Sequence, residues 1–266
     1  MNRSTIAVTG VASGIGASLA SILKDVGHTV IGFDIVKPAS AIDQFIPLDL
    51  SDPASIALAA QACPDGLTGL GNIAGVPPRD GMEVAILQIN FLGQRTFTNA
   101  LLPKLRTGAS IVNMASRAGH RWRDSINQVK RFSAIANADA LKRFVEEEVI
   151  DSVRAYDLSK EAMILWTAAE SEPLIARDIR INSLSPGAVA TGILDDFARA
   201  FGDRMAKSVA RAGRPGTADE IAEIAAFLLS SKSRWIKGTD ISIDGGIGAF
   251  AMTDVLRLEG LRGSVE

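Results

Sequence analysis

Short runs of β-forming residues alternate with longer stretches of helical periodicity along nearly the whole chain. The apolar runs typical of strands fall at 4–9, 29–33, 45–48, 67–73, 109–114, 179–184 and 241–243. The helical stretches between them are 15–26, one that opens at Asp52-Pro53, 87–105, 153–170 and 219–229. This alternation predicts a parallel, doubly wound sheet with helices on both faces. Since no linker or repeat interrupts it, we expect one α/β domain over residues 1–266.

Composition and charge exclude several classes of function. The net charge is −2, and no Lys/Arg block is long enough to follow a phosphate backbone, so we expect no nucleic-acid partner. No run approaches the roughly 20 apolar residues that a membrane helix needs. Cys63 is the only cysteine, and with two histidines the chain offers little for a disulfide or a metal site. We therefore expect a cytoplasmic protein without a metal and without a membrane partner.

A glycine-rich turn follows the first predicted strand and leads directly into a helix. It reads Thr-Gly-Val-Ala-Ser-Gly-Ile-Gly over residues 9–16. Glycines let the backbone approach a pyrophosphate closely, and a helix N-terminus offers it free N–H groups. The spacing is G-x-x-x-G-x-G and not the usual G-x-G-x-x-G, but its place after the first strand predicts a dinucleotide site. The residues expected to contact the cofactor here are Gly10, Ser13, Gly14, Ile15 and Gly16.

An acidic residue, Asp34, ends the second predicted strand. At this place a carboxylate can accept hydrogen bonds from the adenosine ribose. A 2′-phosphate would meet the same negative charge, and the glycine-rich turn has no basic residue to compensate it. We therefore expect NAD in preference to NADP, while Lys37 nearby keeps NADP open as the alternative.

Tyr156 and Lys160 stand four residues apart on a predicted helix, which places them on one face. A tyrosine titrates near about 10, but an adjacent ammonium group favours the phenolate and lowers the pKa. An alcohol dehydrogenase that uses no metal needs such a group to exchange a proton with the substrate oxygen. Tyr156 is the only tyrosine in the chain. The pair therefore predicts acid/base chemistry at Tyr156.

These features occur in a fixed order along the chain. After the glycine-rich turn come Asn72-Ile73-Ala74-Gly75, Asn90, Ser116, Tyr156 with Lys160, and Pro186-Gly187. In this order, and over nearly its whole length, the chain resembles the classical short-chain dehydrogenase/reductase family. The resemblance implies a Rossmann-like fold and hydride transfer between a substrate carbon and a nicotinamide cofactor.

The resemblance also implies a role for each matching residue. Tyr156 would be the general acid/base, and Ser116 would orient the substrate oxygen. Lys160 would hold the nicotinamide ribose and depress the pKa of Tyr156, and Asn90 would hold a water molecule in the proton relay. Ile73 departs from the family pattern, because many relatives have a second asparagine there, but it would still pack under the cofactor.

Further contacts follow from the same resemblance. Besides the turn and Asp34, the residues expected to bind the cofactor are Asp49, Leu50, Asn72, Ala74, Gly75, Tyr156, Lys160, Pro186, Gly187, Val189 and Thr191. The residues expected to bind the substrate are Ala118, Gly119, Ala188 and Ile193. The mostly small and apolar segment 189–212 would complete the wall, which favours a nonpolar substrate.

The gap between Ser116 and Tyr156 is wider than in most members of the family. We expect the extra segment, about 117–151, to border the mouth of the active site and to alter subunit packing. A similar enlargement is a feature of bacterial 3α-hydroxysteroid dehydrogenase/carbonyl reductases, which the chain also resembles in length. We expect one amphipathic helix in this segment, capped by Asn137 or Asp139, with Leu141, Phe144, Val145 and Val149 on its apolar face. The alternative is a plain surface helix with a solvated charged face.

We therefore expect an NAD-dependent oxidoreductase that interconverts a secondary alcohol and a ketone on a hydrophobic alicyclic small molecule, such as a steroid or terpenoid. A small polar keto compound or sugar is the alternative substrate, and a cofactor-sensing protein is the alternative function. The unbroken set of Asn90, Ser116, Tyr156 and Lys160 argues against the sensor, which needs no proton relay. We expect a homo-oligomer, and a dimer through the C-terminal strand and helix 219–229 in preference to a tetramer.

Overall fold

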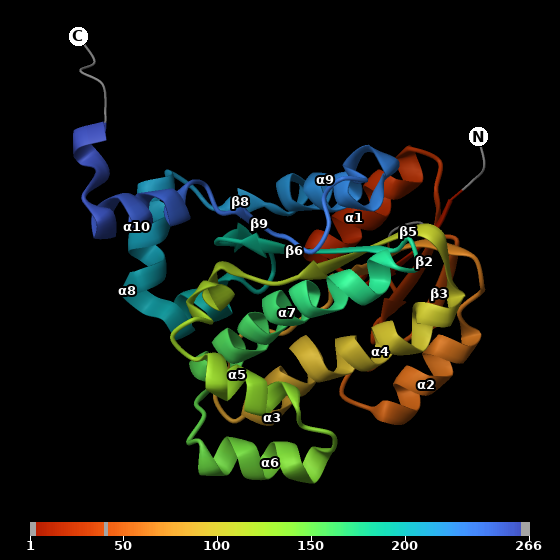
Figure 1. Cartoon of the computed structure of the whole chain (residues 1–266), viewed down its shortest axis with the longest axis horizontal. Coiled ribbons are helices and arrows are strands. Elements are labelled where there is room, and N and C mark those ends of the chain that lie inside the picture. Colours follow the sequence, from red (N-terminus) through yellow and green to blue (C-terminus); the bar gives the residue numbers. More distant parts are fainter. Residues whose placement is uncertain (1–3, 40–41, 262–266) are drawn as a thin grey trace.

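Seven parallel strands form one sheet at the centre of this computed structural model, which describes residues 4–39 and 42–261. The strands lie in the order β3-β2-β1-β4-β5-β6-β9 (Figure 1). Their bounds are β1 Thr5–Thr9, β2 Thr29–Asp34, β3 Gln44–Pro47, β4 Leu67–Asn72, β5 Leu105–Met114, β6 Arg180–Pro186 and β9 Asp240–Ile243. The order reverses between β1 and β4, as in a doubly wound sheet. The predicted single-domain α/β fold is confirmed.

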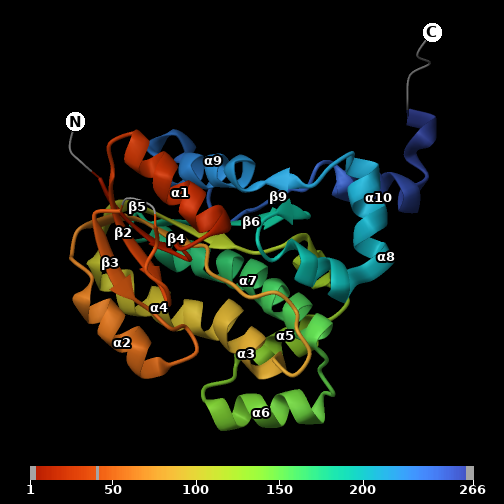
Figure 2. The same cartoon turned by 180° about the vertical axis from the view of Figure 1, so that it is seen from behind.

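Helices cover both faces of the sheet. On one face α1 (Gly14–Asp25) packs against α9 (Ala218–Leu229), and on the other lie α2 (Pro53–Ala62), α4 (Gln94–Leu101) and α7 (Ser152–Ile175) (Figures 1 and 2). Apolar side chains pack in both layers, so strands such as β6 are buried along their whole length. This burial explains why strands such as β1 are mostly apolar in sequence, whereas β6 also buries the polar residues Arg180, Asn182 and Ser183.

The helix predicted over 87–105 is wrong in its bounds and in its regularity. It begins earlier, as α3 (Glu83–Leu87), passes through a π-helical stretch (Gln88–Gly93) and continues as α4. A short 3₁₀ turn, Leu102–Lys104, then leads into β5, which begins at Leu105. Pro103 lies in that turn and has no N–H to continue the helical hydrogen bonds, which accounts for the early end.

The enlarged segment folds into three short helices, the 3₁₀ helix η3 (Arg117–Arg121), α5 (Ile126–Ser133) and α6 (Ala138–Glu147). Asn137 caps α6 by accepting a hydrogen bond from the Ala140 N–H at 2.9 Å, as predicted. Leu141 and Phe144 are buried beneath it. Val149 does not share their face: it lies after the helix end, has a φ of 50° and is 86% exposed.

Two further elements follow β6. A two-stranded parallel ribbon, β7 (Val189–Ala190) with β8 (Gly216–Thr217), brackets α8 (Leu194–Ala212). α8 is kinked at Gly202, whose backbone (φ 48°, ψ −130°) is not helical. The described residues then end in α10 (Ile247–Leu256), beside α8, and a short 3₁₀ helix (Figure 1). Among the described residues, no helix is both long enough and apolar enough to cross a membrane.

A buried ion pair fastens the enlarged segment to α7. The Arg154 guanidinium donates to both carboxylate oxygens of Glu161, at 2.9 and 2.6 Å, and the Glu161 side chain is only 1% exposed. From α5 and the residue before it, the Ser125 hydroxyl donates to Glu161 at 2.7 Å and the Gln128 carbonyl accepts from Arg154 at 2.8 Å. Both charges therefore have their partners, which a buried pair requires to be stable.

Removing the arginine alone should destabilise the protein severely. In Arg154→Met the Glu161 carboxylate stays buried without a counter-ion, which we expect to lower the free energy of unfolding by about 3–5 kcal/mol. The double variant Arg154→Met/Glu161→Leu removes both charges and should recover most of that loss. Urea unfolding at pH 7 measures all the variants. A single variant that unfolds like the wild type would show that the pair contributes nothing.

Candidate active site

The glycine-rich turn between β1 and α1 has the geometry of a phosphate-binding loop. Gly10 and Gly14 have positive φ angles of 76° and 54°. A Cβ atom at Gly16 would lie 2.0 Å from the Gly10 carbonyl oxygen, so no larger residue fits there. The turn therefore brings the backbone close to the first turn of α1, whose N–H groups have no partners within the helix.

Asp34 lies beside this turn at the end of β2, as predicted. Its carboxylate accepts hydrogen bonds from the N–H of Ala12 at 2.9 Å and from the N–H of Val36 at 3.2 Å. Two bonds to the backbone fix the side chain and leave each oxygen a further acceptor position. The half-buried carboxylate is thus positioned next to the phosphate loop, where an adenosine ribose would lie.

Tyr156 and Lys160 lie together on α7, and both are buried. The Lys160 Nζ atom is 5.6 Å from the centre of the tyrosine ring and donates to the Met114 carbonyl at 2.8 Å. Burial lowers the pKa of Lys160 to about 8. Burial also raises the pKa of Tyr156, and a hydrogen bond with Ser116 opposes that rise. The net direction is opposite to the expected effect of Lys160, because the fold withdraws the phenol from water.

Ser116 reaches Tyr156 from the end of β5. It caps η3 by accepting a hydrogen bond from the Ala118 N–H at 3.2 Å. Gly119 packs against the backbone of Lys160, where an added Cβ would lie 2.6 Å from the carbonyl carbon. This contact holds η3 against α7, so the same packing interface fixes the position of Ser116 relative to Tyr156. Gly119 therefore supports the site from behind and does not line the cavity, contrary to the substrate contact expected of it.

Asn90 lies in the π-helical stretch and its side chain is fully engaged. Its Oδ1 atom accepts from the Val76 N–H at 2.8 Å and its Nδ2 atom donates to the Val76 carbonyl at 3.0 Å. A π-turn leaves a helix carbonyl without its regular partner, a feature that occurs at functional sites. In the described structure, the Asn90 side chain thus fixes the loop at Val76.

Several other expected cofactor residues shape the site from within the fold. Asn72 is buried and donates from Nδ2 to Thr98 and to Asn113, both at 2.8 Å. Asn113 in turn donates to Thr167 on α7 at 2.9 Å. Asp49 accepts hydrogen bonds from the N–H and the hydroxyl of Ser51, so its side chain stabilises the turn in which it lies. Neither Asn72 nor Asp49 lines the cavity, and seven further expected contacts also lie outside its lining: Gly10, Ser13, Gly14, Gly16, Asp34, Leu50 and Ala74.

A cavity of about 710 Å³ joins the cofactor end to the catalytic residues. It contains eight of the expected cofactor contacts: Ile15, Gly75, Tyr156, Lys160, Pro186, Gly187, Val189 and Thr191. Ser116 and three of the four expected substrate contacts, Ala118, Ala188 and Ile193, also line it. The residues present therefore fit a dinucleotide that extends from the phosphate loop to Tyr156.

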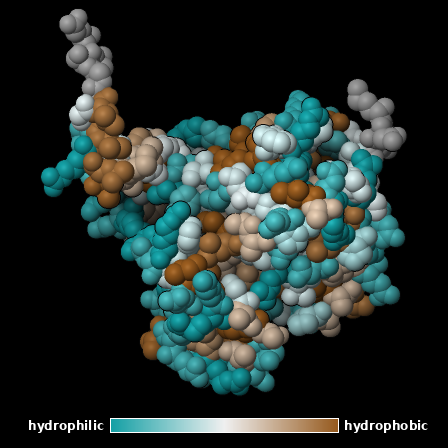
Figure 3. All heavy atoms as spheres, in the orientation of Figure 1, coloured by the Kyte–Doolittle hydropathy of each residue, from teal (hydrophilic) through white to brown (hydrophobic). Residues whose placement is uncertain are grey.

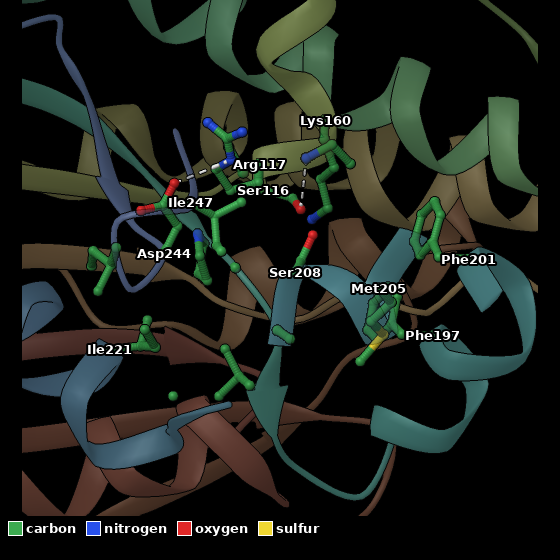
Figure 4. A pocket seen from close by; sticks show the side chains of 18 of the residues that line it. Ser116, Arg117, Lys160, Phe197, Phe201, Met205, Ser208, Ile221, Asp244 and Ile247 are labelled. Carbon is green, nitrogen blue, oxygen red and sulfur yellow. Dashed lines mark hydrogen bonds and ion pairs between the residues drawn. The ribbon is translucent and has the colours of Figure 1, made fainter. Parts of the chain in front are cut away.

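Aromatic residues of α8, which the sequence analysis did not identify, form the far wall. Phe197 and Phe201 pack edge-on to the Tyr156 ring, with centroids 5.1 and 6.2 Å away. Met205 continues their apolar surface along the cavity (Figure 4). The two phenylalanines are four residues apart, a helical spacing that could have been noticed in the segment 189–212.

An ion pair closes the opposite side of the cavity. Arg117 lies directly after Ser116, and its Nε atom is 3.1 Å from the carboxylate of Asp244 (Figure 4). Asp244 also accepts from the N–H groups of Gly246 and Gly248, so it orders the turn before α10. Over residues 4–39 and 42–261, no three His, Cys, Asp or Glu side chains are placed to hold a metal ion.

Comparison with known proteins gives matches along almost the entire chain. Residues 4–128 match the family model described as short chain dehydrogenase, and residues 129–248 match the model described as enoyl-(acyl carrier protein) reductase. A coniferyl-alcohol dehydrogenase of Pseudomonas sp. is 35% identical over 94% of this chain and 98% of its own length.

Two further matches are 3-alpha-hydroxysteroid dehydrogenases, the group that the sequence resembles. The 3-alpha-hydroxysteroid dehydrogenase/carbonyl reductase of Comamonas testosteroni is 29% identical over 92% of this chain and 97% of its own. The crystal structure of the 3-alpha-hydroxysteroid dehydrogenase from Pseudomonas sp. B-0831, complexed with NADH, superimposes with a TM-score of 0.79 at 29% identity. It covers 96% of this chain and 99% of that one. The chain belongs to the short-chain dehydrogenase/reductase family and is an oxidoreductase of the alcohol dehydrogenase/ketoreductase type.

Proposed function

We propose that the protein uses NAD to interconvert a secondary alcohol and a ketone on a hydrophobic alicyclic molecule. The observation that carries this proposal is the meeting of Ser116, Tyr156 and Lys160 in a cavity whose facing wall is aromatic. A small polar sugar would leave Phe197 and Phe201 in contact with its hydroxyl groups, so this alternative has less support. A cofactor sensor would have no use for a buried tyrosine beside a buried lysine.

The chain's own residues supply binding, orientation and proton transfer. In the oxidative direction the Tyr156 oxygen takes the proton of the substrate hydroxyl, and the Ser116 hydroxyl holds the substrate oxygen by a hydrogen bond. The Lys160 ammonium favours the phenolate form of Tyr156. When bound, the nicotinamide supplies the acceptor for the hydride that leaves the substrate carbon. Phe197 and Phe201 exclude water from the reacting centre.

Replacing the phenol should abolish turnover and spare binding. We expect Tyr156→Phe to lower kcat by about 100-fold or more, since general acid/base catalysis contributes that much. The phenylalanine ring keeps the packing against α8, so the affinity for NADH, measured by fluorescence titration, should stay close to that of the wild type. Turnover within tenfold of the wild type would refute the role of Tyr156.

Preference for NAD rests on the position of Asp34. Its carboxylate lies beside the phosphate loop and is held there by two backbone N–H groups. A 2′-phosphate in the same place would bring two negative charges together. Lys37, the basic residue that keeps NADP as the alternative, is exposed. The NADH in the related hydroxysteroid dehydrogenase structure supports the same choice.

Asp34→Ala should reduce the difference in kcat/KM between NAD and NADP. We expect kcat/KM with NAD to fall by about tenfold, the loss typical of hydrogen bonds to a charged group, while kcat/KM with NADP rises. The exposed Asp25, at the end of α1, offers a control for the change of charge, and Asp25→Ala should leave the ratio unchanged. A wild-type protein that prefers NADP would contradict the argument.

For the assembly we propose a homodimer in the cytoplasm, formed through β9, α9 and their surroundings. Support comes from exposed apolar groups: Trp235, shortly before β9, is 92% exposed, and Val255 on α10 is 80% exposed. The hydrophobic surface of α10 is visible in Figure 3 at the upper left. The single cysteine, Cys63, is unpaired and buried, which fits a reducing compartment.

Light scattering on the purified protein tests the assembly. We expect a mass of twice 28.0 kDa, because α5 and α6 pack beside α3 and α7 and cover the helices that would join two dimers. Val255→Glu places a charge in the exposed apolar surface of α10 and should shift the protein towards the monomer. A mass of four times 28.0 kDa would reject the dimer.

A further inference from the structure

Asp157, the residue after Tyr156, faces the substrate end of the cavity. It lies on α7 and is part of the cavity lining, together with Phe201 and Arg204 of α8. Successive side chains on an α-helix point about 100° apart, so Asp157 is beside the reacting centre and not at it. The carboxylate is therefore placed to meet a part of the substrate other than the carbon that gives up the hydride.

The carboxylate of Asp157 has no hydrogen-bond donor of its own. Its Oδ1 atom is buried, and none of the described residues donates to it. The neighbouring Arg154 is engaged elsewhere, since its guanidinium donates to Glu161 and to Gln128. Buried polar atoms nearly always have a partner, and one that lacks it lowers the stability of the fold. The other oxygen, Oδ2, is the one that remains accessible where Asp157 lines the cavity, and none of the described residues donates a hydrogen bond to it either, so it is a vacant acceptor.

The charges around Asp157 indicate which kind of donor it would accept. Burial raises its pKa to about 6, Arg204 and Arg154 oppose the rise, and Glu161 and Asp151 add to it. The group is therefore ionised at pH 8, where it only accepts hydrogen bonds. Two arginines already compensate the negative charge, and the Arg204 guanidinium lies 4.6 Å from the centre of the Phe201 ring. This setting suits a neutral hydroxyl better than a second cation.

We propose that Asp157 is a specificity-determining residue that accepts a hydrogen bond from a second hydroxyl group on the substrate, remote from the carbon that is oxidised. This inference rests on the proposed function and makes it narrower: the substrate is a diol or a hydroxyaryl alcohol with an apolar body. The aromatic rings of Phe197 and Phe201 pack against that body, and the Asp157 carboxylate accepts a hydrogen bond from the hydroxyl at its far end.

Matched alcohols that differ in one remote hydroxyl test the proposal. Two pairs of secondary alcohols are cyclohexanol with cyclohexane-1,4-diol, and 4-phenylcyclohexanol with 4-(4-hydroxyphenyl)cyclohexanol. At pH 8 we expect the wild type to prefer the hydroxylated member of at least one pair by about 10- to 100-fold in kcat/KM, as a site built to bond a hydroxyl does. Asp157→Leu should remove the preference through KM, and Asp157→Asn, which keeps an acceptor oxygen, should retain part of it.

Asp203→Asn is the matched control, because Asp203 is exposed on α8, carries the same charge and does not line the cavity. It should leave both the rates and the preference unchanged. Equal rates within both pairs, or a preference that survives in Asp157→Leu, would overturn the inference while the dehydrogenase activity itself stands. If the wild type prefers 4-aminocyclohexanol, which is a cation at pH 8, to the diol, then Asp157 binds a cation in preference to a hydroxyl, and this result would also overturn the inference.

A second measurement keeps the inference independent of turnover. Calorimetric titration of the protein and NAD with 4-propylphenol and with propylbenzene compares the same body with and without the hydroxyl. We expect tighter binding of the phenol by the wild type and equal binding by Asp157→Leu. If no alcohol is oxidised, the proposed function fails, and this titration still decides the role of Asp157: equal binding by the wild type would refute it.

Discussion

The site depends on keeping one ammonium group inside the protein. Lys160 is buried, and its Nζ atom donates to the carbonyl at the end of β5, that of Met114. A charge in that position stabilises the fold only if strand and helix stay together, so the end of β5 and the middle of α7 cannot separate without exposing an unpaired group. Ser116, two residues beyond Met114, and Tyr156, one turn before Lys160, are brought together by the same contact. Catalytic geometry and packing thus have a common origin here.

Much of the fold could be predicted because both faces of the sheet are buried. Strands such as β1 and β2 are then mostly apolar runs, and the helices between them keep a 3.6-residue period that marks their positions. The closeness of Tyr156 and Lys160 could also be predicted, because a spacing of four residues on a helix brings two side chains to one face. Asp34 could be placed since the end of a parallel strand is the edge where ligands bind.

The remainder depends on contacts between distant segments. Nothing in the local pattern tells whether Val149 continues its helix, and the structure places it outside, in a left-handed conformation. The expected effect of Lys160 on Tyr156 considers one neighbour, whereas the pKa responds to the whole surroundings, in which burial is the larger influence. Gly119 is small because η3 approaches α7 there, and that approach exists only in three dimensions. Phe197 and Phe201 become a wall only because α8 folds back over the cavity.

Two buried asparagines give the sheet a property of its own. Asn72 and Asn113 lie opposite each other in β4 and β5, and each is bonded further to a threonine of a covering helix. Because strand side chains alternate between faces, a slip of one residue would turn an amide towards the opposite, apolar layer. The two strands can therefore be aligned in one way only. Ser116 is three residues beyond Asn113, and Gly75 is three residues beyond Asn72. Because Asn72 and Asn113 are paired in the sheet, both site residues follow their strands at the same distance from this pair. Strand register can change only by whole residues, so the relative positions of Ser116 and Gly75 are fixed by the pairing of β4 with β5 and cannot shift gradually.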